Sequence, residues 1–234
     1  MEELYKKTLD RLKAELKKQL PEIEANGDWL WHHPEAGFKE TETQKYCLEV
    51  LKNHGFEACT WPDVTGFTCT YDTGRPGPCV MIMGEMDSLI CYSHPDCNPE
   101  TGAAHACGHS IQVATAMGAF ITLTESGVLE NFGGKVMLAG VPAEECLEIE
   151  WRTREIQKGR LHYLCGKAEL LYRGAFDGVD IVISMHAGLG NDGTITILGS
   201  HNGFISKNVT FQGRSAHAAA DPENGINALY MANT

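Results

Sequence analysis

Cys79-Val80-Met81-Ile82-Met83-Gly84 is an apolar run that stops at the polar stretch Glu85-Met86-Asp87-Ser88. A short, continuously apolar run is typical of a strand covered on both faces, as in the parallel sheets of α/β proteins. Open α/β sheets keep their chemistry at the carboxyl ends of such strands. The stretch therefore predicts a central strand with functional polar residues at its end.

The same pattern occurs twice more along the chain. Residues 135–139 form an apolar strand followed by a turn and then Glu144-Glu145. Residues 179–184 form another, which we expect to be buried, and it leads into Met185-His186. If these strands share one sheet, then Asp87, Glu144-Glu145 and His186 meet at one edge of it.

Helical patterns alternate with these strands. Apolar residues at spacings of three and four mark residues 2–20, and Pro21 is expected to end that helix. Further helices are expected around Trp29–Trp31, before Gly55, from His109 to about Glu125, and within residues 152–173. The alternation predicts an α/β fold: a mostly parallel central sheet with helices on both faces.

A turn crowded with polar residues separates two of these helices: His33-Pro34-Glu35-Ala36-Gly37-Phe38-Lys39-Glu40. Its Pro and Gly predict a turn, and its acidic residues are suited to capping the following helix. Capping and packing are the expected roles, with an approach to a functional site as the alternative.

The character of the sequence changes after Gly199. Residues 204–211 alternate like a half-exposed strand, and a helix is expected from Asn227 to Ala232. We therefore predict one domain over residues 1–199 and the beginning of a second over residues 200–234. The second stretch is too short to bury a core alone, so it either packs on the first domain or belongs to a longer chain.

Composition excludes some classes of partner. The net charge is −12, with 19 Lys and Arg against 31 Asp and Glu, which argues against binding nucleic acid or anionic membranes. No apolar run reaches the length of a membrane span, and the amino terminus lacks a signal peptide. Nine scattered cysteines fit reduced thiols better than a disulfide framework. These features predict a soluble, cytoplasmic protein.

His105-Ala106-Cys107-Gly108-His109 places three metal-binding side chains within five residues. Imidazoles need hydrogen-bond partners when buried, so core filling explains this poorly. The favoured interpretation makes Cys107, His109, Glu145 and His186 ligands of Zn²⁺ or a similar divalent ion.

A metal at these residues would supply an activated water for attack on an amide or ester. Glu144 would then be the general base, and Asp87 a ligand or an acceptor that orients a histidine. Two consecutive glutamates can divide these tasks if the backbone turns there, as Pro142 suggests. His217 could donate to the developing oxyanion.

Other interpretations of the same residues remain open. Glutamate pairs usually lie on the solvated surface, and a single histidine at a strand end, such as His186, is usually structural. A structural zinc site could instead use Cys91, His94 and Cys97 with Cys107 or His109. Such a site would fill all four metal positions with protein and leave none for water.

Six motifs together, in order, resemble the amidohydrolase branch of the aminoacylase/carboxypeptidase metallohydrolases. They are His33-Pro34-Glu35-x-Gly37-Phe38-x-Glu40, Gly84-Glu85-Met86-Asp87-Ser88-Leu89, His105-Ala106-Cys107-Gly108-His109, Pro142-Ala143-Glu144-Glu145, Met185-His186, and the stretch from Gly213 to Leu229 that contains Ser215-Ala216-His217 and Gly225-Ile226-Asn227.

The resemblance implies a metal-dependent hydrolase of N-acyl amino acids or short peptides with one or two divalent ions (Zn, Mn or Co). It also implies a catalytic domain followed by a smaller α+β lid that makes a homodimer. On the matching positions it makes Cys107, His109, Glu145 and His186 ligands, Glu144 the base and Asp87 an orienting residue. His217 and Asn227 become substrate-binding residues, and His217 typically acts across the dimer.

This chain departs from the family pattern in two places. Members usually carry Asp or Asn directly after the second histidine of the Cys-Gly-His motif, whereas this chain has Ser110. The family also expects a last histidine ligand after the lid, and the chain holds four of the five ligands. The chain therefore resembles the amino-terminal half of such an enzyme. A non-catalytic protein that keeps a metal or ligand pocket is the alternative function.

Overall fold

A computed structural model describes residues 2–188, 195, 203, 207 and 209–233. The chain divides into two compact units, Met1–Leu189 and Gly190–Thr234. All four predicted metal ligands lie in the first unit, whereas His217 and Asn227 lie in the second.

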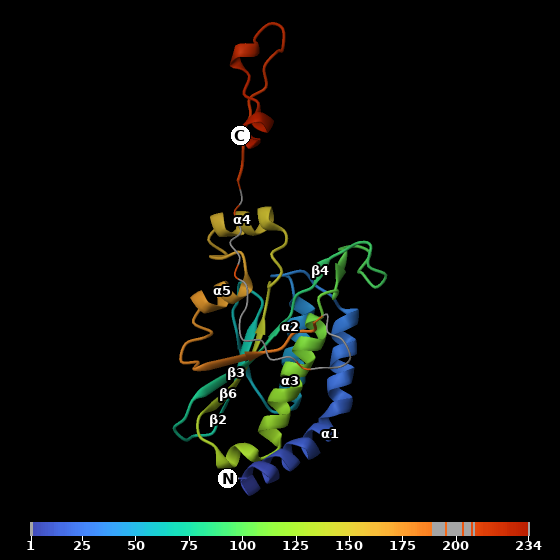
Figure 1. Cartoon of the computed structure of the whole chain (residues 1–234), viewed down its shortest axis with the longest axis vertical. Coiled ribbons are helices and arrows are strands. Elements are labelled where there is room, and N and C mark those ends of the chain that lie inside the picture. Colours follow the sequence, from blue (N-terminus) through green and yellow to red (C-terminus); the bar gives the residue numbers. More distant parts are fainter. Residues whose placement is uncertain (1, 189–194, 196–202, 204–206, 208, 234) are drawn as a thin grey trace. The chain divides into compact units, whose positions relative to one another are not determined.

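The first unit is built on a five-stranded sheet with the order β1-β2-β6-β3-β7 (Figure 1). Its strands are β1 (Ala58–Thr60), β2 (Phe67–Asp72), β3 (Cys79–Glu85), β6 (Lys135–Val141) and β7 (Ile181–Ser184). β6, β3 and β7 run parallel, while β1 and β2 pair antiparallel along the other side. The predicted α/β fold is confirmed, and its parallel part carries the three polar strand ends.

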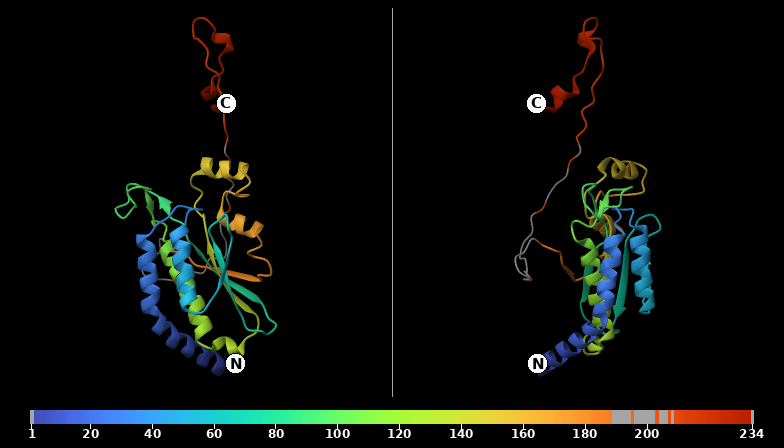
Figure 2. Two further views of the ribbon diagram at one scale, coloured as in Figure 1. Left: turned by 180° about the vertical axis from the view of Figure 1, so that it is seen from behind. Right: turned by 90° about the vertical axis from the view of Figure 1, so that its right-hand side faces the viewer.

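Helices cover both faces of this sheet (Figures 1 and 2). On one face, α1 (Glu2–His32), α2 (Thr41–Asn53) and α3 (His109–Glu125) pack in one apolar core with strand residues that include Phe67 and Ile82. On the other face, Leu170 of α5 (Gly166–Tyr172) packs with Met81 and Met83. The alternation of β3 side chains between these cores explains why that strand is apolar throughout.

The first helix differs from the prediction. α1 runs without interruption from Glu2 to His32, so Pro21 lies inside it rather than at its end, and the two expected helices are one. Proline removes one backbone hydrogen bond and bends a helix without always ending it; Figure 2 shows α1 bent. No helix in the described part of the chain is both long and apolar enough to cross a membrane.

The burial predicted for the third strand is wrong. All four residues of β7 are exposed, with Ile183 at 52%. β7 is the last strand of the sheet, so one of its edges is unpaired, and no described helix buries its faces. The apolar composition correctly predicted a strand in the same sheet, but composition alone does not show whether that strand is covered.

Two shorter features leave the sheet. β4 (Leu89–Ile90) and β5 (Ala103–Ala104) pair antiparallel and close a loop of residues 91–102. A second excursion, residues 144–165, carries the helix α4 (Ile149–Gln157).

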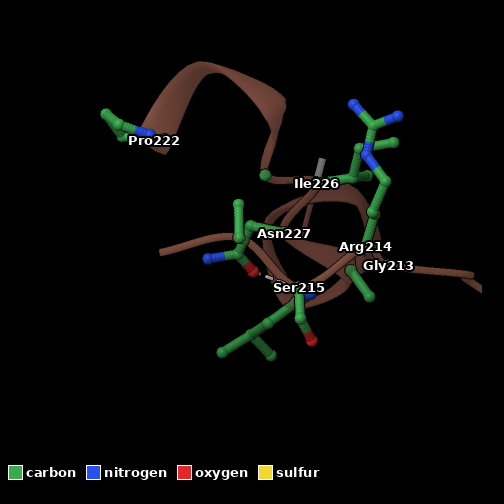
Figure 3. Close-up of a pocket in the computed structure, with 10 residues that line it drawn as sticks. Gly213, Arg214, Ser215, Pro222, Ile226 and Asn227 are labelled. Atoms are coloured by element: carbon green, nitrogen blue, oxygen red, sulfur yellow. Dashed lines mark hydrogen bonds between the residues drawn. The ribbon is translucent and has the colours of Figure 1, made fainter. Parts of the chain in front are cut away.

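In the second unit, a backbone bridge joins Arg214 and Ile226, and both of its hydrogen bonds form. The short helices η2 (Pro222–Asn224) and α6 (Ala228–Ala232) follow. The hollow drawn in Figure 3 lies between these segments. Much of the strand predicted over residues 204–211 lies outside the described residues, and the described residues 209–211 form no strand.

The polar turn before α2 caps that helix, as predicted. The Glu35 carboxylate accepts hydrogen bonds from the backbone N–H groups of Glu42 and Thr43 at 3.2 and 2.8 Å. Glu40, at the end of the same turn, is fully buried and accepts from the backbone N–H of Ala143 at 2.8 Å and from the Thr65 hydroxyl. The turn therefore also reaches the segment that carries Glu144.

Glu40 makes stability depend on pH. Burial, together with the negative charge of Asp87, raises the pKa of Glu40 to about 8. Because the folded state holds this proton more tightly than the unfolded state, Glu40's contribution to stability is full below about pH 4.5 and is lost as pH rises through 8.

We expect Glu40→Gln to reduce the loss of unfolding free energy between pH 5 and 9 by an amount on the order of a few kcal/mol. Denaturant unfolding at several pH values measures this. The exposed Glu42→Gln on α2 is the matched control and should keep the wild-type slope. Equal slopes for wild type and Glu40→Gln would contradict the assignment.

Candidate metal centre

The carboxyl ends of β6, β3 and β7 bring the predicted residues together. Glu85 pairs with Val141, and Met83 pairs with Ser184, so all three strands end at the same sheet edge. α3 begins there at His109, after Gly108, whose φ of 88° is accessible at little cost to glycine. One donor atom from each of Cys107, His109 and His186 lies within 4.8 Å of the other two.

His109 presents a free nitrogen to this point. Its Nδ1 lies 2.9 Å from the backbone carbonyl oxygen of Asp87, which can only accept, so Nδ1 carries the proton. Nε2 is buried and makes no hydrogen bond, although an oxygen of Glu85 lies 3.2 Å away. Burial lowers the pKa of His109, but the Asp87 and Glu85 carboxylates outweigh it and raise this pKa to about 9. A buried imidazole nitrogen held in this way is suited to binding a metal ion, because its partner on Nδ1 fixes both tautomer and orientation.

His186 is oriented by the same logic. Its Nδ1 donates to the carbonyl oxygen of Ala187 at 2.6 Å, and its Nε2 lies 3.5 Å from the Cys107 sulfur. The His109 and His186 rings lie edge to face, with centroids 5.5 Å apart. A nitrogen of each imidazole and the Cys107 sulfur therefore lie close together, within 4.8 Å of one another.

The thiol of Cys107 carries its proton at neutral pH when no cation is present. Burial, a hydrogen bond to Glu145 and the charges of neighbouring carboxylates raise its pKa to about 12. A thiolate, two imidazoles and a nearby carboxylate are the mixed donor set of a first-row divalent ion. The residues present fit such an ion. The most direct observation in favour of a metal ion is Nε2 of His109, which is buried and makes no hydrogen bond.

Asp87 lies beneath this cluster and is fully buried. Its Oδ2 accepts from the backbone N–H of Glu145 at 2.9 Å, and its Oδ1 lies 3.2 Å from Nδ1 of His109 without good hydrogen-bond geometry. Asp87 thus contacts two predicted ligands, Glu145 through its backbone and His109 through Nδ1 of its ring. This geometry suits an orienting residue rather than a metal ligand.

The backbone turns between Pro142 and Glu145. Ala143 has a φ of 49°, which is uncommon for a residue other than glycine, and the buried Glu40 carboxylate accepts from its N–H. The turn separates the two glutamates, since Glu145 contacts Cys107 while Glu144 lies within 3.8 Å of Lys167. The turn expected at Pro142 is present, and the division of tasks between the two glutamates stays a prediction.

Glu85 and Lys167 belong to the centre, although the sequence interpretation gave them no role. Glu85 is buried, its Oε2 lies 3.2 Å from Nε2 of His109, and its other oxygen forms an ion pair with Lys167. Glu85, His109 and Glu144 form a second group of possible ligands. Glu85 could have been found as the last residue of a buried strand, whereas nothing in the local sequence marks Lys167.

Glu144 has the electrostatics expected of a base. Burial and the negative charge of Glu85 raise its pKa, while Lys167 opposes the shift. A carboxylate whose pKa moves towards neutrality is a better proton acceptor at that pH than an ordinary glutamate.

The structural zinc alternative is not supported. Among the described residues, no group of three metal-binding side chains includes Cys91, His94 or Cys97. Local contacts use them instead: the Cys91 and Cys97 sulfurs lie 3.4 Å from the Ser93 hydroxyl and 3.6 Å from the Tyr92 carbonyl oxygen. His105 is buried without hydrogen-bond partners, and burial lowers its pKa to about 4, so it stays neutral.

The two predicted substrate-binding residues lie in the second unit. His217 is exposed, and its Nδ1 accepts from the backbone N–H groups of Ala219 and Ala220, so Nε2 carries the proton in the neutral ring. Asn227, labelled in Figure 3, caps α6 with its side-chain oxygen, which accepts from Leu229 and Tyr230. Substrate binding by either residue stays a prediction.

Known proteins are similar over most of this chain. It is 33% identical over 184 residues to one of the subunits of p-aminobenzoyl-glutamate hydrolase from Escherichia coli, covering 72% of this chain and 37% of the relative. It is 31% identical over 182 residues to indole-3-acetyl-aspartic acid hydrolase of Enterobacter agglomerans, with the same coverage. An N-acetyl-L-cysteine deacetylase of Bacillus subtilis is 27% identical over 93% of this chain and 48% of its own length. The chain thus spans about half, or less, of these relatives.

Solved structures share the fold. An aminobenzoyl-glutamate utilization protein from Klebsiella pneumoniae superposes with a TM-score of 0.62 at 19% identity, over 95% of this chain and 58% of that one. A dinuclear metal-binding peptidase of the M20 family from Bacillus subtilis gives 0.57 at 24% identity, over 75% and 44%. No family model matches the sequence. The hydrolase relatives and the shared fold together identify the chain as a homologue of the amidohydrolase branch of the aminoacylase/carboxypeptidase metallohydrolases.

Proposed function

We propose that the protein is a metal-dependent amidohydrolase that cleaves N-acyl amino acids or short peptides. The observation that carries this proposal is the convergence of Cys107, His109 and His186 beside a carboxylate with a raised pKa, Glu144. The names of the hydrolase relatives, which refer to acylated amino acids, support the substrate class. The chain spans only part of those relatives, so hydrolytic activity of the whole protein is itself part of what we propose.

We propose Cys107, His109, Glu145 and His186 as the residues that would hold one or two divalent ions, namely Zn, Mn or Co. Such an ion supplies a Lewis acid for the scissile carbonyl and lowers the pKa of water to about 7. Glu145 is included for its contact with the Cys107 thiol and for the fixed position of its backbone N–H on Asp87.

The remaining work falls to residues around the ligands. Glu144 takes a proton from the attacking water at a carboxylate oxygen and passes it to the leaving nitrogen. Asp87 holds His109 and Glu145 in register. Lys167 pairs with Glu85 and Glu144, and its positive charge lowers the pKa of Glu144, which favours the ionised form that accepts a proton.

Substrate binding and assembly complete the proposal. His217 is suited to donating a hydrogen bond through Nε2 to the oxygen that becomes negative, and Asn227 would assist from the same unit. The resemblance supports a homodimer formed through a lid that begins with the second unit. Nine cysteines, none in a disulfide, support a cytoplasmic location.

The alternative is a protein that binds a metal or ligand without turnover. Metal binding alone does not separate the two functions. A variant that keeps the metal and loses hydrolysis does separate them.

A kinetic prediction concerns Glu144. Glu144→Gln should lower kcat for an N-acyl amino acid by roughly 10²–10⁴-fold while metal content stays at the wild-type level, because the variant loses the proton acceptor and keeps the ligands. Steady-state kinetics and elemental analysis measure both. The exposed Glu150→Gln on α4 is the control. Unchanged turnover in Glu144→Gln would refute the role of the base.

A spectroscopic prediction concerns Cys107. Cobalt(II) added to the metal-free protein should give a near-ultraviolet sulfur-to-cobalt charge-transfer band, which Cys107→Ser abolishes. Cys91→Ser and Cys97→Ser serve as matched controls and should keep the band. A band that survives in Cys107→Ser and disappears in either control would support the structural site instead.

A prediction about pH dependence concerns Lys167. Its positive charge lowers the pKa of Glu144, so Lys167→Met should raise that pKa and move the acidic limb of the kcat/KM profile to higher pH. Lys167→Arg should restore the wild-type limb because it keeps the charge. A merely structural role would lower activity at all pH values and leave the limb in place.

A further inference from the structure

Residues 144–165 leave the sheet after the Pro142-Ala143 turn and return to it at α5. The two ends of this excursion meet closely. The backbone N–H of Gly166 donates to the carbonyl oxygen of Ala143 at 3.0 Å. A Cβ at position 166 would lie 1.6 Å from the carbonyl oxygen of Pro142, so only glycine permits this approach. The excursion is therefore a loop with a narrow neck.

Two cysteines face each other across that neck. The Cys165 thiol donates to the Cys146 sulfur at 3.6 Å, and both residues are partly exposed. A disulfide bond is about 2.05 Å long, so the sulfurs need to approach by about 1.5 Å to form one. Burial and the hydrogen bond to Cys146 raise the pKa of the Cys165 thiol to about 11.

Polar contacts hold the excursion of residues 144–165 in place. Arg152 of α4 is fully buried and donates to the carbonyl oxygen of Leu164 at 2.7 Å, directly beside Cys165. Lys39 forms an ion pair of 2.6 Å with Glu148 and lies over the Trp151 ring. The cysteines are therefore brought together by the folded chain rather than by a freely moving loop.

We propose that Cys146 and Cys165 are a modification site at which a low-molecular-weight disulfide, such as oxidised glutathione, installs a reversible disulfide bond. One protein thiol, as its thiolate, attacks a sulfur of the reagent and displaces one thiol from it. The second protein thiol then attacks the resulting mixed disulfide and displaces the other. The protein pair loses two electrons, the reagent gains them, and the two protein protons leave on the two released thiols.

The bond would join the residue after Glu145 to the residue before Gly166-Lys167, and so close the neck covalently. The formation of this bond does not depend on the proposed function. Cys107 is a different thiol, since its neighbours are His186 and Glu145.

Peptide mapping tests the proposal directly. The intact protein is incubated with oxidised glutathione, its free thiols are alkylated without reduction, and it is digested with trypsin. The two cysteines then fall in separate peptides, residues 136–152 and residues 161–167. We expect these peptides to be found joined, with a mass two hydrogens below their sum, for most of the Cys146 present. Dithiothreitol should release them.

Cys146→Ser and Cys165→Ser should each abolish the linked peptide. Cys59→Ser, which removes an exposed cysteine on β1, is the matched control and should leave it unchanged. The wild-type map decides the question even if a variant folds poorly. Alkylated Cys146 and Cys165, a separate glutathione adduct on each, or a bond from either to Cys107 would overturn the proposal.

Discussion

The candidate metal centre depends on the hydrogen bonds and contacts that the buried Asp87 makes with Glu145 and His109. Oδ2 of Asp87 accepts a hydrogen bond from the backbone N–H of Glu145. Nδ1 of His109 donates to the backbone carbonyl oxygen of Asp87 and lies 3.2 Å from Oδ1. β3 and the turn after β6 are thereby held in register at the point where their side chains converge. The contact also fixes the tautomer of His109, because a carbonyl oxygen can only accept a hydrogen bond. Without the Asp87 carboxylate, the turn that carries both glutamates would lose the hydrogen bond that anchors it at Glu145.

The buried carboxyl group of Glu40 also stabilises the turn that carries Glu144 and Glu145. Glu40 accepts from the N–H of Ala143, whose backbone lies in the left-handed region. Gly37 lies so close to Ala143 that a Cβ at position 37 would come within 2.6 Å of its Cα. A strained conformation persists only when its surroundings determine it fully, and here the surroundings are a buried hydrogen bond and a close backbone contact. The result is a turn that directs Glu144 and Glu145 to different partners.

Charge is concentrated at this edge of the sheet. Glu85, Asp87, Glu144 and Glu145 approach one another. Lys167 pairs with Glu85 and Glu144, and His109 lies 3.2 Å from carboxylate oxygens of Glu85 and Asp87. Carboxylates buried together raise each other's pKa unless positive charge is nearby. Burial and this negative charge together raise the pKa of Glu144 and of the Cys107 thiol. A divalent ion bound among these donors would relieve it, which is the electrostatic reason to expect one.

The sequence by itself determined the strands, their polar ends and the short-range cluster of Cys107 and His109, because periodicity and residue type are local properties. It also placed Glu35 as a cap and led to the edge of the sheet where His186 lies. Only the tertiary structure decided that α1 continues through Pro21, that β7 is an exposed edge strand, and that Lys167 and Glu85 join the site. These outcomes depend on what packs against each segment, and contacts such as Lys167 with Glu85, or Cys146 with Cys165, arise when the chain returns after a long excursion. Local sequence does not predict which distant residues come into contact, because the path of the folded backbone decides that.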